Sequence, residues 1–181
     1  MKNSLYLAIL ITFVLVSCNS EPDPFLIQKQ NIGHLTDSTK VFDLKTVFVT
    51  DSVVTNKANG FNSSPTVEIL DKATGKQLLL LTPISADSTS TIEVVQIMDA
   101  RYKTEKGLNM LSTFKDIDEN YTISSIDNLL RSVVISVKEI DASFTIDKEQ
   151  LPGNVRFNMN SKIEASQIPD HAKIKYFMIH W

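Results

Sequence analysis

The sequence predicts an α+β fold, in which two short amphipathic helices pack against a mostly antiparallel sheet. Two runs, residues 40–48 and 107–121, follow or contain a Ser-Thr pair suited to helix capping and place apolar residues at helical spacing. Most of the remaining chain consists of segments with β-type alternation, separated by residues that favour turns. Both signals together indicate helices on one side of a sheet.

The first element expected along the chain is a helix. We expect no regular structure in Phe25–Gly33, and Asp37–Thr39 then supplies cap residues for a helix over Lys40–Phe48. Four apolar residues of that run fall on one helical face: Val41, Leu44, Val47 and Phe48.

The next segment predicts a hairpin. Asp51–Val54 is expected to begin a strand, and residues 56–65 form a loop rich in turn formers. Thr66–Leu70 and Gln77–Thr82 flank the turn Asp71–Lys76, in which a glycine stands where a positive φ would fit.

The second strand of this hairpin is apolar on both faces. Leu78–Leu81 therefore predicts either a central strand covered on both sides or a strand whose outer face meets another molecule. Pro83 ends the strand, Ser85–Ser90 is a polar loop, and Thr91–Met98 resumes β character.

The second half of the chain is predicted to be rich in strands. Tyr121–Ile126 can form one strand, and two alternating runs of opposite parity meet at Lys138-Glu139, which indicates a tight turn or a bulge. Leu151–Gly153 breaks the chain, and Phe157–Ile163 fits no single element. The alternating residues are Val133, Ile135 and Val137, then Ile140, Ala142, Phe144 and Ile146.

The chain is expected to close with a strand over Ala172–Trp181, after a turn at Ile168–His171. Ile174, Tyr176 and Met178 share one face of this strand, and Phe177, Ile179 and Trp181 share the other. Because no polar tail follows Trp181, we expect this strand to be held within the sheet.

A loose repeat suggests an internal duplication. Gly33 precedes Ser38-Thr39 by five residues, and Gly107 precedes Ser112-Thr113 by the same five. Asp43-Leu44 and Phe48 then correspond to Asp116-Ile117 and Tyr121 after a one-residue gap. Each copy would comprise a turn, a capped helix and a strand.

Composition is that of one folded domain, expected over residues 25–181, because roughly 160 residues support a single core. The net charge of −3 gives no basic patch for nucleic acid. Cys18 is the sole cysteine, so neither a disulfide nor a cysteine metal site is expected.

The first eighteen residues predict an export signal. Lys2 precedes the apolar run Leu5–Val16, which at about 12 residues is shorter than the roughly 20 of a membrane-spanning helix. Leu15-Val16-Ser17-Cys18 resembles the lipobox of bacterial lipoproteins. The resemblance implies a signal peptide over residues 1–17, a diacylglyceryl thioether on Cys18 and, after cleavage, acylation of its amine by a fatty acid such as palmitate. The alternatives are an uncleaved anchor helix and an ordinary secretory signal.

A lipidated Cys18 would hold the protein on a membrane of a bacterial envelope, since two or more acyl chains anchor firmly. Asn19, where many inner-membrane lipoproteins have Asp, favours the outer membrane, on its periplasmic or surface face. Residues 18–24 are expected to form an extended tether because they are polar and interrupted by proline.

No catalytic or metal-binding motif stands out. His34, His171 and His180 each lack a second histidine or an acidic residue at a ligand spacing, and a structural hydrogen bond is expected for His180. We therefore expect no cofactor, and a non-catalytic protein that binds an envelope protein or a cell-wall component. The alternative is a membrane-anchored hydrolase whose site is assembled from dispersed carboxylates and His34 or His171.

Three Asp-Ser pairs are candidates for modification. Asp37-Ser38-Thr39, Asp51-Ser52-Val53 and Asp87-Ser88-Thr89 resemble the Asp-Ser/Thr-apolar acceptor motif for O-glycosylation in some Gram-negative bacteria. The resemblance implies glycans on Ser38, Ser52 and Ser88. Because Asp-Ser pairs also cap helices and form turns, the alternative is a purely local structural role.

Overall fold

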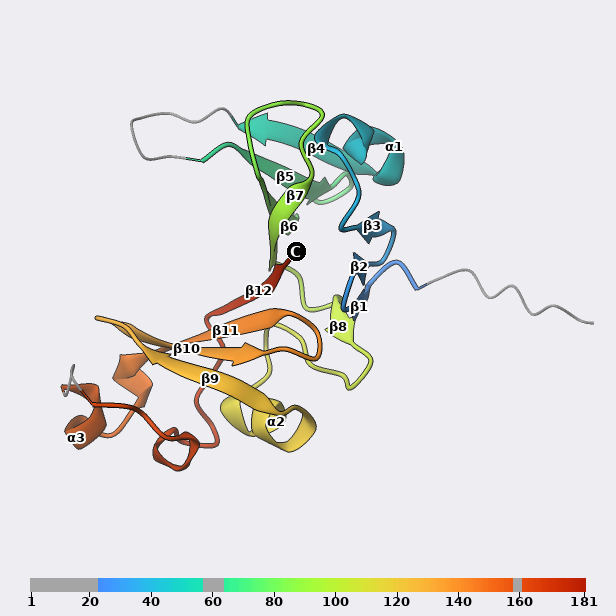
Figure 1. The fold of residues 1–181 in the computed structure, drawn as a ribbon. Coiled ribbons are helices and arrows are strands. Elements are labelled where there is room, and N and C mark those ends of the chain that lie inside the picture. The colour runs from blue at the N-terminus through green and yellow to red at the C-terminus, as the bar shows by residue number, and fades with distance from the viewer. Residues whose placement is uncertain (1–22, 57–63, 158–160) are drawn as a thin grey trace, which may run out of the picture.

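The computed structural model describes residues 23–56, 64–157 and 161–181. Its main element is an eight-stranded antiparallel sheet in the order β4-β5-β6-β7-β12-β11-β10-β9 (Figure 1). With only short helices beside it, the fold is α+β or mainly β, which confirms the predicted mostly antiparallel sheet. The strands are β4 (Asp51–Asn56), β5 (Thr66–Asp71), β6 (Gln77–Pro83), β7 (Ile92–Ile97), β9 (Ile123–Asn128), β10 (Ser132–Val137), β11 (Ala142–Asp147) and β12 (Tyr176–His180).

Strands β4 to β7 form a first meander, and the predicted hairpin is its β5–β6 pair. Gly75 has a φ of +70° in the turn, as the sequence predicted. In β6, Leu79 and Leu81 are buried against the core, whereas Leu80 on the other face is half-buried. Strand β6 is therefore central, but its outer face is only partly covered.

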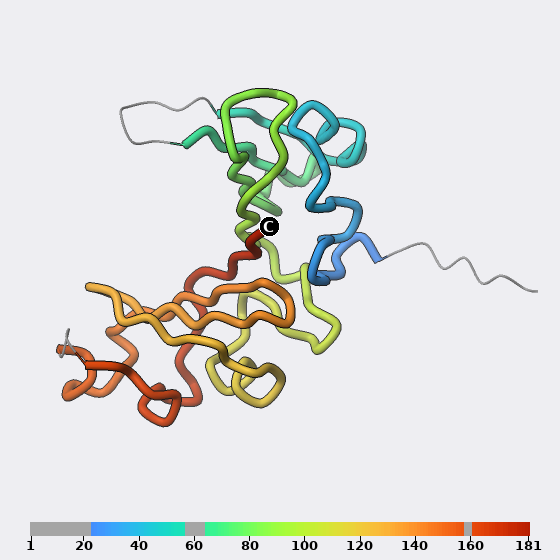
Figure 2. The backbone as a smooth tube through the Cα atoms, in the orientation of Figure 1, coloured from blue at the N-terminus to red at the C-terminus, as the bar shows by residue number. Residues whose placement is uncertain are grey.

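Strands β9 to β12 form a second meander. The predicted phase change is the turn between β10 and β11, where Asp141 has a φ of +47° and Val137 pairs with Ala142. Strand β12 lies between β11 and β7, and Phe177 and Ile179 face the core while Tyr176 and Met178 face outward. This strand joins the two meanders at the centre of the sheet (Figures 1 and 2).

The prediction that residues 25–33 lack regular structure is wrong. They contribute β1 (Leu26–Gln28) and β2 (Asn31–Ile32), which form a small sheet with β3 (Leu35–Thr36) and β8 (Lys103–Thr104). These strands have only two or three residues, which is too short for an alternating pattern to be recognised in sequence. Buried Ile27 and Ile32 anchor them to the core.

Helices lie in both predicted segments. The first is a 3₁₀ turn, η1 (Val41–Asp43), that continues into α1 (Leu44–Val47), and the second is α2 (Phe114–Asn120). The predicted cap at Asp37–Thr39 is wrong, because the first helix begins after Lys40, whose side chain makes no capping hydrogen bond.

The second helix has a cap. The Asp116 carboxylate accepts hydrogen bonds from the Thr113 N–H at 2.7 Å and from the Thr113 hydroxyl at 3.0 Å. A third helix, α3 (Gly153–Arg156), begins where the sequence indicated a break. Two 3₁₀ turns, η2 (Lys148–Gln150) and η3 (Ala165–Gln167), flank it.

A helix precedes each meander, and the start of that helix is hydrogen-bonded to the residues just before the last strand of the meander. In the first unit (residues 41–97), Lys40 forms an isolated antiparallel bridge with Thr91, just before β7. The next N–H, of Val41, donates to the Ser90 carbonyl at 2.9 Å.

The second unit (residues 114–180) repeats this arrangement. Thr113 bridges Lys173, shortly before β12, and the Phe114 N–H donates to the Ala172 carbonyl at 2.8 Å. In both units the first helical residue is therefore hydrogen-bonded to the chain that leads into the last strand.

The helices also end alike. The Phe48 N–H donates to the Leu44 carbonyl, and the Tyr121 N–H donates to the Ile117 carbonyl, each at 2.9 Å. Leu44 and Ile117 are fully buried, and Phe48 and Tyr121 are each 7% exposed. The buried apolar residues of both units belong to one cluster, within which the Phe144 and Phe177 rings lie 4.6 Å apart.

Candidate functional site

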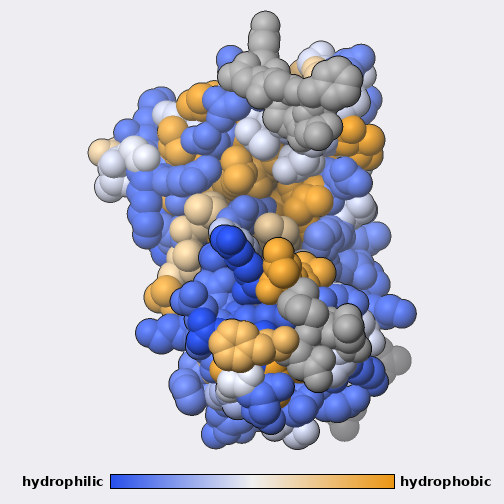
Figure 3. All heavy atoms as spheres, turned by 90° about the vertical axis from the view of Figure 1, so that its left-hand side faces the viewer, coloured by the Kyte–Doolittle hydropathy of each residue, from blue (hydrophilic) through white to orange (hydrophobic). Residues whose placement is uncertain are grey.

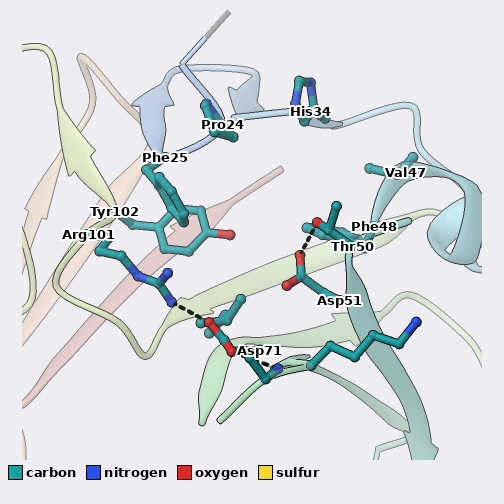
Figure 4. A pocket seen from close by; sticks show the side chains of 13 residues that line it. Pro24, Phe25, His34, Val47, Phe48, Thr50, Asp51, Asp71, Arg101 and Tyr102 are labelled. Atoms are coloured by element: carbon teal, nitrogen blue, oxygen red, sulfur yellow. Dashed lines mark hydrogen bonds and ion pairs between the residues drawn. The ribbon is translucent and has the colours of Figure 1, made fainter. Parts of the chain in front are cut away.

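A hollow of about 690 Å³ lies between the small sheet and the first unit, and we call it the Tyr102 pocket (Figure 4). Segments from five parts of the chain border it. The lining residues are Pro24, Phe25, His34, Val47, Phe48, Thr50, Asp51, Asp71, Lys72, Ala73, Leu78, Arg101 and Tyr102. Its walls thus combine aromatic and aliphatic side chains with several charged groups.

Gly33 brings the edge of the small sheet against the start of the described chain. It has a φ of +58°, and a Cβ atom at this position would lie 2.0 Å from the Pro24 carbonyl oxygen. A side chain is therefore excluded both by the left-handed backbone and by the close approach. This contact sets the position of Pro24 and Phe25 at the pocket wall.

A cluster of charges beside the pocket is fixed by ion pairs. The Asp99 carboxylate, only 4% exposed, lies 2.9 Å from the Lys76 Nζ and 3.0 Å from the Arg101 Nε. Burial alone would raise the pKa of Asp99, but the Arg101 backbone N–H and the Lys76 and Arg101 side chains outweigh it and lower the pKa to about 2. Asp99 therefore remains ionised at neutral pH.

Arg101 connects this cluster to the pocket wall. Its Nη2 lies 3.2 Å from the Asp71 Oδ2, and its guanidinium lies 4.8 Å from the Phe25 ring centroid. The pKa of Asp71 is lowered by the hydrogen bonds from Thr74, with a further contribution from Arg101. Two carboxylates thus already neutralise the guanidinium.

Tyr102 forms the floor of the pocket. Its ring is buried and meets Phe25 edge-on, with centroids 5.1 Å apart. Burial, and then the charge of Asp51, raise the pKa of Tyr102, so its hydroxyl stays protonated. Figure 4 shows this hydroxyl pointing across the pocket toward Thr50 and Asp51, and it has no hydrogen-bond partner among the described residues.

Asp51, at the start of β4, differs from the other pocket carboxylate. Its carboxylate accepts a hydrogen bond from the Thr50 hydroxyl at 3.4 Å. Within the described part of the chain it forms no ion pair. The pocket therefore offers an uncompensated carboxylate and a protonated hydroxyl above an aromatic floor, an arrangement suited to binding.

The structure does not bring the three histidines together. His34 lies at the rim of the Tyr102 pocket, and His171 is exposed in a turn. His180, at the end of β12, has its Nε2 2.7 Å from the Ser143 Oγ of β11. The hydrogen bond expected for His180 is present. Among the described residues, no group of three His, Cys, Asp or Glu residues could hold a metal ion.

The serines predicted to be modified do not line this pocket. Cys18 is outside the described residues. Ser38 and Ser88 are exposed in loops, and Ser52 is half-buried within β4. Glycosylation at these three serines stays a prediction.

Sequence reasoning did not identify the pocket residues that carry charge and polarity. Asp99, Arg101 and Tyr102 stand in a segment with neither a motif nor a periodic pattern. They lie near Asp71 and Asp51 only because the segment after β7 returns to the side of the first hairpin. The one local signal is the Asp-x-Arg spacing, in which the Arg101 N–H bonds to the Asp99 carboxylate at 2.9 Å.

Exposed apolar side chains also occur elsewhere. Figure 3 shows a hydrophobic grouping in a hollow on the face that lies to the left in Figure 1. Leu130 and Phe157 are 73% and 78% exposed, and they border a second hollow of about 480 Å³ with Arg131 and Arg156. In the described residues, no helix is long and apolar enough to cross a bilayer.

Comparison with known proteins shows a related fold. No protein family and no curated protein matches the sequence. The structure is similar to the crystal structure of the uncharacterized protein yfeY from Escherichia coli, with a TM-score of 0.56 and 13% sequence identity. The match covers 86% of this chain and 99% of that chain. At this identity the likeness shows the fold alone.

Proposed function

We propose that this chain is a lipid-anchored protein of a bacterial cell envelope that binds an envelope partner through the Tyr102 pocket and catalyses no reaction. Its anchor is the lipid on Cys18, and the outer membrane is the favoured location. The observation that supports a binding role is that the charged side chains at the pocket wall are paired with one another. Arg101, Asp71 and Asp99 hold one another in place, which suits recognition of a fixed shape better than proton transfer.

The position of the pocket supports its use near a membrane. Pro24, six residues after Cys18, belongs to the pocket wall. A chain of that length spans at most about 20 Å even when fully extended. A partner bound in the pocket would therefore lie close to the bilayer surface that holds the lipid.

We also infer that the α+β fold arose by duplication of a helix-and-meander unit. The matching bridges of Lys40 and Thr113 and the matching helix ends at Phe48 and Tyr121 support it. So does the strand order, in which the last strands of the two meanders pair with each other. Gly33 and Gly107, both with positive φ, precede the two helices.

The anchor is tested by replacing its cysteine. The full chain is produced in a Gram-negative host, and cells are broken without detergent. We expect the natural chain in the membrane fraction and Cys18→Ser in the supernatant, whereas Ser20→Ala, which keeps the cysteine, stays in the membrane. A natural chain found in the supernatant would contradict the anchor.

The binding role is tested by photo-crosslinking in intact envelopes. A photoreactive residue replaces exposed Lys72 at the pocket rim, and a control replaces exposed Lys138 at the corresponding turn of the second unit. We expect an irradiation-dependent adduct from position 72 and none from position 138. Absence of any adduct at 72 would count against the pocket as the binding site.

A hydrolase is the second candidate, and one contact favours it. The Ser143 Oγ lies 2.7 Å from the His180 Nε2, a distance typical of a nucleophile and its base. The pair borders a hollow of about 430 Å³, whose Asp141 carboxylate is 3.4 Å from the Lys29 Nζ. This site uses His180 in place of the predicted His34 or His171. Covalent labelling of Ser143 by a fluorophosphonate would favour the hydrolase over the binding protein.

A further inference from the structure

We propose that the Tyr102 pocket receives a lysine side chain of a partner protein, with the ammonium group against the Asp51 carboxylate and the methylene stem on the aromatic floor. This inference rests on the proposed binding function and names the chemical group that the pocket recognises. The unpaired carboxylate and aromatic lining of the pocket carry it, and the second unit shows how such groups hold an ammonium group.

A lysine side chain lies beside the end of the helix in the second unit. The Lys106 Nζ lies 4.2 Å from the Tyr121 ring centroid and 3.0 Å from the Glu139 Oε2. It also donates a hydrogen bond to the Asn120 carbonyl. An ammonium group beside the helix end is thus held by an aromatic face, a carboxylate and a backbone carbonyl.

The first unit has an aromatic ring and a carboxylate, Asp51, at its helix end, but within the described residues this carboxylate forms no ion pair. Phe48, which matches Tyr121, borders the Tyr102 pocket, and Asp51 follows it by three residues. Two cations line the pocket. The Arg101 guanidinium is bound between Asp71 and Asp99, and exposed Lys72 at the rim forms no ion pair among the described residues.

Glu139, which pairs with Lys106, lies in the turn between β10 and β11. At the matching turn of the first unit, Asp71 pairs with Arg101. Asp51 is therefore an additional carboxylate, left without an ion pair among the described residues.

The shape and polarity of the pocket select among cations. A lysine stem of four methylenes can lie along Phe48, Leu78 and Tyr102 while its ammonium group reaches Asp51. The protonated Tyr102 hydroxyl can accept a hydrogen bond from the same ammonium group. A phospholipid amine has a two-carbon stem next to a phosphate, and that phosphate would meet the negative Asp51 and Asp71. A protein lysine is the better fit.

The test uses the full-length lipidated protein in detergent micelles and two blocked pentapeptides, with lysine or norleucine between alanines. Norleucine keeps the apolar stem and lacks the ammonium group. Binding is followed by NMR shifts of backbone amides. We expect the lysine peptide to bind at least about tenfold more tightly than the norleucine peptide, with shifts at residues 48–51 and 101–102.

Two variants locate the interaction. Asp51→Asn is expected to weaken lysine-peptide binding by at least about tenfold, and Tyr102→Phe by a smaller factor, while Glu139→Gln in the second unit leaves it unchanged. Thermal unfolding of each variant checks that it is folded. Soluble phosphoethanolamine serves as the lipid-headgroup probe and is expected to bind at least about tenfold more weakly.

Several outcomes would overturn the inference. They are equal affinity for the two peptides, no effect of Asp51→Asn, and tighter binding of phosphoethanolamine than of the lysine peptide. If neither peptide binds while the crosslinker at position 72 still captures a partner, the lysine assignment fails and the binding function stands. If neither experiment detects binding, both fail.

Discussion

The two units share a backbone plan and differ in what lies beside the end of each helix. In the first unit that space is the Tyr102 pocket, whereas in the second the Lys106 side chain lies over Tyr121 and pairs with Glu139. Both Arg101 and Lys106 come from the segment that connects the units. The difference shows that the space beside the helix end can be left as a pocket or occupied by a lysine side chain. Which of the two occurs depends on where the connecting segment places its basic residues.

The units also differ in the connection before their last strand. In the first, residues 84–91 lead directly from β6 to β7. In the second, residues 148–175 separate β11 from β12 and include α3 and two 3₁₀ turns. Both connections still hydrogen-bond to the start of the helix in their own unit. The added length therefore lies outside the shared hydrogen-bond scheme, as expected for a surface insertion.

The largest difference between the units is predicted at their glycines. Gly33→Ala is expected to destabilise the protein by about 3 kcal/mol or more, because a left-handed backbone is strained and the new Cβ would meet the Pro24 carbonyl at 2.0 Å. Gly107→Ala has the same left-handed strain but nothing within 4 Å of its Cβ, so about 1 kcal/mol is expected. Urea denaturation of both variants measures the two values. Equal losses would show that the contact with Pro24 does not set the position of the pocket wall.

These glycines also show how far sequence could reach. Their spacing to Ser-Thr pairs suggested a repeat, and Asp43-Leu44 and Asp116-Ile117, which were matched in sequence, both lie in helical segments. The hairpin at Gly75 and the division of β12 into two faces followed from composition and alternation, because those patterns are local. Which of the two faces is buried did not follow from the sequence. The pocket could not be found this way. Asp51 and Tyr102 face each other only through the packing of distant segments, and β1, β2 and β8 are too short to leave a periodic signal.

A smaller difference is predicted for the two ion-pair sites as pH falls. Asp99 has a folded pKa of about 2, below the value of about 3.9 in an unfolded chain, so it stabilises the fold above pH 4. That contribution, roughly 2 kcal/mol, is lost as pH falls from about 4 to about 2. Asp99→Asn is therefore expected to be less stable than the natural chain at pH 7, with the gap closing toward pH 2. Denaturant midpoints at several pH values give the curve.

The control for that curve lies in the second unit. The pKa of Glu139 is lowered by the Thr122 backbone N–H and by Lys106, but both partners of the ion pair are about half exposed to solvent. Glu139→Gln is expected to shift the pH dependence in the same direction by a smaller amount, since solvent screens exposed pairs. A larger effect for Glu139 than for Asp99 would contradict the stronger stabilisation expected from the buried Asp99 carboxylate.

The smallest predicted difference concerns the starts of the two helices. Asp116 accepts two hydrogen bonds from Thr113, whereas the matching Asp43 makes no side-chain hydrogen bond among the described residues. Asp116→Ala is expected to cost about 1 kcal/mol, the usual effect of losing a cap, and Asp43→Ala less than about 0.5 kcal/mol. Chemical denaturation separates the two. The helical segment starts as a 3₁₀ turn in the first unit and as an α-helix in the second, and Asp116→Ala is expected to increase amide hydrogen exchange in residues 117–120. Unchanged exchange there would mean that packing of Phe114 and Ile117, not the cap, holds α2 in its helical conformation.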